Sequence, residues 1–295
     1  GGGAIYSSSS VVGTAATITN STFTGNAEVG GSGGGGAIRN RSGTMDISDS
    51  NFTNNAGIAA GAIQGGGVTN ISGSTFTGNR ATGTNAPTGQ GNGGAISNTG
   101  GAQTNISNSI ITGNEAVGHG GGIYYQPNGG SASMNVTNTT ISNNVANTNS
   151  DLTGSGGGIY IAGGVGVVTV TGSTISGNLT KINTQTADLR FSGDGGGFYV
   201  EGALTLDNST VSGNVAEQSY GGIVDTNPGG TADQVHISNS TIVNNRAAGT
   251  CGGFGIDSVS DTGQQSLRNT IIANNTAGAN PDVRTASPIN SLGYN

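Results

Sequence analysis

A short motif recurs nine times along the chain with constant internal spacing. Each copy begins at an aliphatic anchor. Ser or Thr stands three positions later, Phe, Ile or Val five later, Gly or Asn seven later, and Asn eight later. The nine anchors are Ile18, Ile47, Ile71, Ile106, Val136, Val170, Leu206, Ile237 and Leu267. This regularity indicates a chain assembled from repeated structural units.

The position eight residues after each anchor is always asparagine, and successive asparagines are 24 to 36 residues apart. We expect their side chains to stack in a corner of the fold, bonded to each other and to backbone groups that the bend leaves unpaired. The predicted asparagine ladder consists of Asn26, Asn55, Asn79, Asn114, Asn144, Asn178, Asn214, Asn245 and Asn275.

The motif alternates polar and apolar residues around the anchor and again around the residue five positions later, which is the period of a β-strand. Asn, Asp or Gly separates the two strands, and Gly or Asn follows the second. These residue types tolerate the left-handed backbone conformation, so each predicts a sharp bend. A further block, Gly-(Gly/Ala)-(Ile/Phe), precedes every anchor and predicts a third strand. The density of Gly and β-branched residues disfavours helices.

One such unit cannot bury its own apolar residues, whereas stacked units bury Ile, Phe and Val against their equivalents in the next coil. We therefore predict an all-β, right-handed parallel β-helix (a β-solenoid) of about nine coils with three short strands each. Residues 1–295 form a single domain in this interpretation, and 277–295 form an irregular last coil or C-terminal cap. The chain opens within a repeat block, so we expect it to be a fragment of a longer protein.

The repeat residues resemble those of a known family. Gly-Gly-Ala-Ile at 2–5, 35–38 and 93–96, together with Phe-x-x-Asn at 23–26, 52–55 and 76–79, is similar to the paired repeats of chlamydial polymorphic outer-membrane proteins. The ending from Asn269 onward resembles the last coils of secreted, adhesin-like bacterial β-helix proteins that carry a C-terminal anchor. The resemblance implies a β-helix displayed at the bacterial cell surface and leaves the molecular function open.

Charge and cysteine content narrow the range of functions. Eight basic residues against fifteen acidic ones give a net charge of −7, which offers no surface for nucleic acid. A single cysteine excludes internal disulfides and paired-cysteine metal sites. We predict no membrane span in this sequence, no cofactor, no metal site and no catalytic residues. Calcium in the loops is an alternative that no acidic cluster supports.

One column of residues that points away from the core is a candidate ligand-binding surface. The position after the Ile or Phe of the Gly block holds Tyr124, Tyr160 and Tyr199 in three successive repeats. Stacked aromatic rings on an outer face would suit sugar rings or a partner protein. The alternative is that like-on-like tyrosine stacking serves stability alone.

Residues with catalytic potential are few, and we interpret each as structural or solvated. His119 lies in a glycine-rich loop and is expected to be exposed to solvent, whereas Cys251 is expected to be a buried free thiol. The insertion 179–195 holds Lys181, Asp188, Arg190 and Asp194, an ordinary density of charge for a solvated loop. His236, beside the anchor Ile237, is expected to point outward. Asp46 and Asp49 do not suggest catalysis, because Asp49 occupies a bend position and no paired carboxylates suited to glycoside hydrolysis are present.

These observations favour a non-enzymatic extracellular protein, either an adhesin-like module or a structural stalk. Its partners would be a glycan or protein of a host or neighbouring cell, or another copy bound end to end. The variable loops 27–34, 80–92, 145–156 and 179–195, and the tyrosine column, are the predicted contact regions.

Two alternatives remain open from the sequence. A polysaccharide-binding or polysaccharide-degrading, pectin lyase-like protein predicts a groove with clustered carboxylates and a basic residue beside the tyrosines. An ice-binding protein predicts a flat, loop-free face of Thr-x-Thr ranks. The candidate ranks are Thr22/Thr24, Asn51/Thr53, Thr75/Thr77, Ile110/Thr112, Thr140/Ser142, Thr174/Ser176 and Thr210/Ser212.

Overall fold

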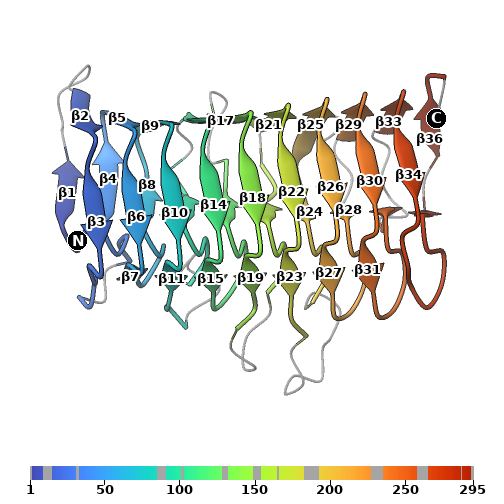
Figure 1. Cartoon of the computed structure of the whole chain (residues 1–295), viewed down its shortest axis with the longest axis horizontal. Coiled ribbons are helices and arrows are strands. Elements are labelled where there is room, and N and C mark those ends of the chain that lie inside the picture. Colours follow the sequence, from blue (N-terminus) through green and yellow to red (C-terminus); the bar gives the residue numbers. More distant parts are fainter. Residues whose placement is uncertain are drawn as a thin grey trace.

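The protein is a parallel β-helix, a stack of coils along one axis (Figure 1). The structure, a computed structural model, describes residues 2–8, 15–30, 33–84, 91–100, 103–127, 132–148, 154–164, 166–182, 193–226, 235–257, 265–286 and 288–293. All strands in this part of the chain belong to four sheets, named A to D here, and every strand pairing is parallel.

Sheets A and B each contain ten strands and run the length of the stack. Sheet A contains β1 (Ile5–Ser8), β4 (Ile38–Ser42), β8 (Ile63–Gly65), β12 (Ile96–Asn98), β16 (Ile123–Tyr125), β20 (Ile159–Ile161), β24 (Phe198–Val200), β28 (Ile223–Asp225), β32 (Phe254–Ile256) and β35 (Val283–Thr285). Sheet B contains β2 (Ala15–Thr19), β5 (Thr44–Ser48), β9 (Val68–Ser72), β13 (Thr104–Ser107), β17 (Ala132–Thr137), β21 (Gly166–Thr171), β25 (Ala203–Asp207), β29 (Val235–Ser238), β33 (Gln265–Arg268) and β36 (Ile289–Ser291).

Sheets C and D contain shorter strands. Sheet C contains β3 (Thr22–Thr24), β6 (Asn51–Thr53), β10 (Thr75–Thr77), β14 (Ile110–Thr112), β18 (Thr140–Ser142), β22 (Thr174–Ser176), β26 (Thr210–Ser212), β30 (Thr241–Val243) and β34 (Ile271–Ala273). Sheet D contains β7 (Ala56–Gly57), β11 (Arg80–Ala81), β15 (Glu115–Ala116), β19 (Val145–Ala146), β23 (Leu179–Thr180), β27 (Val215–Ala216) and β31 (Arg246–Ala247).

The predicted fold class is confirmed, and the coils contain one element more than expected. The Gly block forms sheet A, the anchor forms sheet B, and the residue five positions later lies in sheet C. The two-residue strands of sheet D follow directly after the invariant asparagines and were not predicted. Two residues are too few to display an alternating pattern, so periodicity alone could not reveal them.

Both predicted bends adopt the left-handed backbone conformation in every repeat. The bend between sheets B and C has φ between 46° and 60°, from Asn20 to Asn269, and the bend after sheet C has φ between 54° and 65°. Asn, Asp and Gly occupy these positions because other side chains clash with the backbone there. A single left-handed residue at each bend keeps sheet C free of insertions on both sides.

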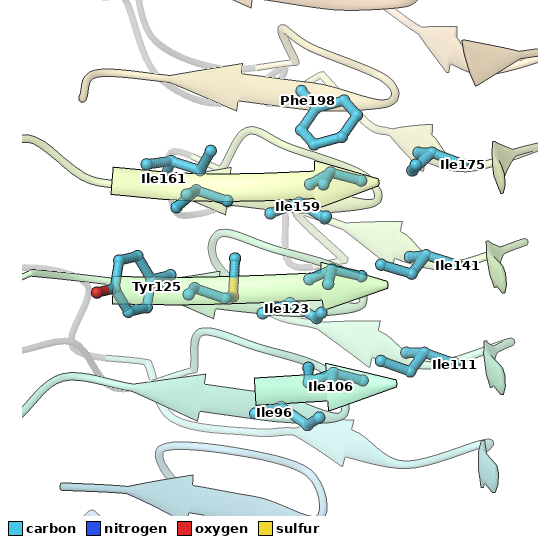
Figure 2. Close-up of a cluster of buried hydrophobic side chains, with 14 of the residues drawn as sticks. Ile96, Ile106, Ile111, Ile123, Tyr125, Ile141, Ile159, Ile161, Ile175 and Phe198 are labelled. Atoms are coloured by element: carbon cyan, nitrogen blue, oxygen red, sulfur yellow. The ribbon is translucent and has the colours of Figure 1, made fainter. Parts of the chain in front are cut away.

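The core consists of columns of equivalent side chains, one from each coil. Figure 2 shows Ile111, Ile141 and Ile175 of sheet C in one such column, with all three side chains buried. Near the N-terminus, Phe52 stacks between Phe23 and Phe76, with ring centroids 4.8 and 4.6 Å away. In-register pairing repeats each contact at every coil, so burial stabilises the whole stack.

The asparagine ladder is present and continuous. The side-chain Nδ2 of each asparagine donates to the Oδ1 of the next at 2.8 to 2.9 Å. The backbone N–H also donates to that Oδ1, as in Asn144 to Asn178 at 3.0 Å. The second N–H of Asn144 donates to the carbonyl of Ile111 at 3.0 Å. Since Asn114 donates twice to Asn144 Oδ1, this side chain is saturated.

The Ser or Thr three positions after each anchor forms a second ladder. This residue lies in the bend, directly after the left-handed residue, and is buried in every coil from Ser50 to Thr270. The hydroxyl oxygen accepts a hydrogen bond from the backbone N–H of the equivalent residue in the preceding coil; for example, Ser50 N–H donates to Ser74 Oγ at 3.1 Å. The same hydroxyl donates to the carbonyl two residues earlier, as Ser74 does to Ser72 O at 2.9 Å. A hydroxyl both donates and accepts, which explains why only Ser and Thr occur there.

The asparagine ladder ends at Asp282, whose Oδ1 accepts the backbone N–H and the Nδ2 of Asn275 at 3.0 and 2.9 Å. The carboxyl oxygen accepts both bonds, so Asp282 closes a ladder in which the asparagines from Asn55 to Asn275 both donate and accept. Beyond it, β35 and β36 extend sheets A and B by parallel pairing with β32 and β33. Residues 277–295 therefore include a partial further coil.

Asn144→Ala should lower the free energy of unfolding by about 1–3 kcal/mol, because it removes the acceptor of the buried Asn114 backbone N–H and the side-chain hydrogen bond to the Ile111 carbonyl. Asn51→Ala, the same change at an exposed position of sheet C, serves as the control and should change stability by less than about 0.5 kcal/mol. Urea unfolding of both variants measures the difference. Equal destabilisation would contradict the ladder.

Candidate binding surfaces

The tyrosine column on the outer face of sheet A is formed as predicted but is not exposed. Tyr124, Tyr160 and Tyr199 are in register, with ring centroids 5.4 and 4.9 Å apart. Their exposed fractions are only 6%, 6% and 3%. The expectation of an open aromatic face is therefore wrong.

Residues of the connections on both sides of sheet A close over the tyrosines. Ala162 follows β20, whereas Tyr220 and Cys251 precede β28 and β32, and all three pack into one apolar cluster with the column. The alternating pattern predicted the direction of the tyrosine side chains. It carried no information about the connections that cover them. Cys251 is a buried free thiol, as predicted, and burial raises its pKa to about 12.

A carboxylate lies beside the column and was not identified from the sequence. The hydroxyl of Tyr160 donates to Glu201 Oε1 at 2.8 Å, and the backbone N–H of Gly163 donates to Oε2 at 3.1 Å. Burial raises the pKa of Tyr124 to about 12 and that of Tyr160 well above its usual value. The hydroxyl groups of these tyrosines are thus neutral and are held by the protein itself.

His119 is partly buried against the tyrosine column, and the expectation that it would be solvated is wrong. Its ring centroid lies 4.3 Å from that of Tyr160, and its Nδ1 accepts the backbone N–H of Ser155 at 3.1 Å. Burial lowers the pKa of His119 to about 4. The imidazole is therefore neutral at pH 7, with its proton on Nε2.

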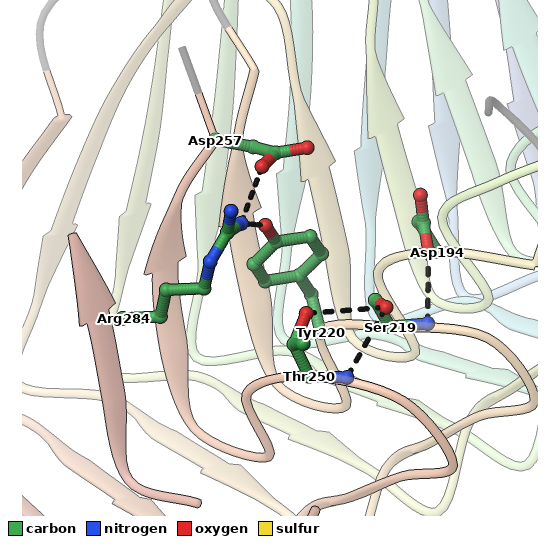
Figure 3. A network of polar contacts seen from close by, with 6 residues as sticks. All are labelled: Asp194, Ser219, Tyr220, Thr250, Asp257 and Arg284. Carbon is green, nitrogen blue, oxygen red and sulfur yellow. Dashed lines mark hydrogen bonds and ion pairs between the residues drawn. The ribbon is translucent and has the colours of Figure 1, made fainter. Parts of the chain in front are cut away.

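His119 belongs to a third ladder, which the sequence did not reveal. The backbone N–H of His119 donates to Asn92 Oδ1 at 2.8 Å, just as Ser155 donates to His119. Further along, the backbone N–H of Ser219 donates to Asp194 Oδ1 at 2.8 Å, and the backbone N–H of Thr250 donates to Ser219 Oγ at 3.3 Å (Figure 3). Each coil needs only one side-chain acceptor for one backbone N–H at this position. Asn, His, Asp and Ser can all supply it, so no repeat motif is visible in the sequence.

Asp194 is therefore a structural acceptor rather than part of a solvated charged loop. Its side chain is 6% exposed, and burial raises its pKa to about 7. Lys181 lies at the start of the same connection, whereas Asp188 and Arg190 lie outside the described residues. Parts of the loops 27–34, 80–92, 145–156 and 179–195 also lie outside them, and their predicted role in recognition stays a prediction.

A basic residue contacts the same side of the fold near its C-terminal end. Arg284 of β35 pairs with Asp257 and reaches the hydroxyl of Tyr220 (Figure 3). Its guanidinium also lies over the Tyr220 ring, 5.7 Å from the centroid. These contacts join the last partial coil to the two coils before it.

The outer face of sheet B carries a shallow groove of about 240 Å³ over its first coils. It is lined by Thr17, Asp46, Ile47, Ser48, Asn70, Ile71, Ser72, Asn105 and Ser107. Ile47 and Ile71 bury their side chains in the core, so the backbone at these residues forms the floor. Asp46, which showed no catalytic pattern in the sequence, is the acidic group of this lining. His236 lies further along the same face, partly exposed as expected.

The outer face of sheet C carries the predicted ranks, which are mostly hydroxyl residues from β3 to β26 but include Asn51 and Ile110. The last two strands present Thr241, Val243, Ile271 and Ala273 at these positions. Thr75 and Thr77 of β10 pair in register with Ile110 and Thr112 of β14, and the same register runs from β3 to β34. Since each strand of sheet C is bounded by two-residue bends, no connection among the described residues crosses this face between its ranks.

Within the described ranges, no group of three or more His, Cys, Asp or Glu side chains is placed to hold a metal ion. No helix long and apolar enough to cross a membrane is found in that part of the chain.

The sequence matches no family model, and neither the curated proteins nor the solved structures give a match.

Asp194→Asn should raise stability at pH 8 by at most about 4 kcal/mol, because the folded chain holds the Asp194 proton to about pH 7 and an unfolded aspartate releases it near 3.8. Between these values the folded state binds more protons, so the free energy of unfolding of the natural chain falls as pH rises. An asparagine still accepts the N–H of Ser219, as Asn92 does from His119.

Thermal unfolding from pH 4 to 8 measures the stability difference between the variant and the natural chain. This difference should be smallest at pH 4 and grow towards pH 8, while His119 titrates equally in both proteins. A difference independent of pH would show that Asp194 ionises normally in the fold.

Proposed function

We propose that this chain is a non-enzymatic, adhesin-like rod module of an extracellular bacterial surface protein. The observation that carries the proposal is the continuous asparagine ladder from Asn26 to Asp282, which makes the coils a stiff and durable spacer. The resemblance of the repeats to surface-displayed β-helix proteins supports the same conclusion. The module presents polar strand faces and variable loops to its partners, a glycan or protein of another cell.

Binding of labelled protein to arrays of glycans and to intact cells tests this proposal, with release of reducing ends measured for every polysaccharide that binds. Heat-unfolded protein serves as the control for adsorption. We expect specific binding without cleavage. Cleavage would contradict the non-enzymatic role, and the absence of binding to any glycan or cell would contradict the adhesin-like role.

Ice binding is a second candidate, favoured by the outer face of sheet C. Its threonine and serine ranks are in register and free of insertions. Strands lie about 4.8 Å apart and alternate residues about 7 Å apart, so the hydroxyl and methyl groups form a flat two-dimensional array. A flat periodic array is suited to a flat periodic surface such as a face of an ice crystal.

Thr174→Tyr should abolish uptake of the protein into a slowly growing ice hemisphere, because the larger ring breaks the flatness of sheet C. Thr205→Tyr on sheet B is the matched control and should leave uptake unchanged. Exclusion of the natural protein from ice, or equal uptake of both variants, would reject this second function.

A further inference from the structure

The groove on sheet B contains a row of side chains whose hydrogen-bonding capacity is only half used. Asn70 donates to Asp46 Oδ1 at 2.7 Å, Asn105 to Asn70 Oδ1 at 2.8 Å, and Asn135 to Asn105 Oδ1 at 2.9 Å. All these bonds run in one direction, towards the carboxylate. The row therefore fixes its own side chains before any ligand arrives.

The contrast with the buried asparagine ladder shows what remains available. Asn79 in that ladder donates to Phe52 O and Asn114 Oδ1, and its Oδ1 accepts two bonds from Asn55, so it has nothing left to offer. Asn70 uses one N–H and one lone pair, which leaves one donor and one acceptor. Asp46 keeps Oδ2 unengaged by the described residues.

The two sides of the groove carry hydrogen-bonding side chains at the same spacing, amides on one side and hydroxyl groups on the other. The amide row stands on one side, and Ser48, Ser72 and Ser107 stand on the other. Successive members are about 4.8 Å apart along the axis, the separation of parallel strands. A ligand that uses these groups must therefore be an extended chain with hydroxyl groups repeated at a similar interval, since a hydroxyl both donates and accepts.

Charge narrows the class of chain further. Among the described residues of the lining, Asp46 is the charged one and none is Lys or Arg, and the protein carries a net charge of −7. A polyanion such as a polyuronate would be repelled by this surface. A neutral polysaccharide carries hydroxyl groups along its length without this penalty.

We propose that the groove on sheet B binds a neutral, extended polysaccharide chain laid along the axis of the β-helix. Hydroxyl groups of successive sugar units bond to Asp46 and the amides of Asn70 and Asn105 on one side, and to the serines on the other. This proposal rests on the adhesin-like function and names the ligand class and the surface.

Affinity electrophoresis and calorimetry with cello-, xylo- and mannohexaose test the site, with hexagalacturonate as the acidic probe. We expect binding of at least one neutral hexaose, and at least about tenfold weaker binding in Asn70→Leu and in Ser72→Leu, which alter opposite sides of the groove. Thr205→Leu, on sheet B outside the groove, should bind like the natural chain. Melting temperatures identify a variant that fails to fold. If either Asn70→Leu or Ser72→Leu fails, binding by the other variant tests the site.

Two results would overturn the site. The first is neutral hexaose binding that both groove variants retain, and the second is preference for hexagalacturonate. Failure of the natural chain to bind any neutral hexaose, together with binding to cells that both variants retain, would reject the groove while leaving the adhesin-like function intact. A natural chain that binds no glycan and no cell would reject both.

Discussion

The structure depends on one requirement: each bend buries backbone N–H groups that need an acceptor from the neighbouring coil. Parallel, in-register stacking places the same bend at the same height in every coil, so one residue type can meet the need repeatedly. Asparagine does so after sheet C, and Ser or Thr does so between sheets B and C. The apolar columns supply most of the burial, whereas these ladders determine the register in which the columns meet.

Saturation of hydrogen bonds separates structural polar residues from residues available for recognition. Asn79 has every donor and acceptor engaged, while Asn70 on the surface retains half of its capacity. The buried tyrosines follow the same rule, because Glu201 engages the hydroxyl of Tyr160. The groove on sheet B and the outer face of sheet C are therefore better candidates for ligand contact than the tyrosine column.

Fold and site differ in how far the sequence predicts them. The left-handed bends and the asparagine ladder follow from the constant spacing, because one steric or hydrogen-bonding demand recurs in every coil. The ladder through Asn92, His119 and Asp194 was missed because any acceptor satisfies it. The burial of Tyr160 and the groove at Asp46 depend on which connections cover a face and which leave it open, and the repeat does not encode that.

Backbone hydrogen exchange in the native protein tests the central claim most directly. The amides of Asn55, Asn144 and Asn214 donate within the ladder and are fully buried. We expect them to exchange only through global unfolding, with the same free energy in every coil and with far slower rates than the amides of the exposed connections. Rapid exchange at these asparagines, or protection that differs sharply between neighbouring coils, would contradict a stack held in register by its corner ladders.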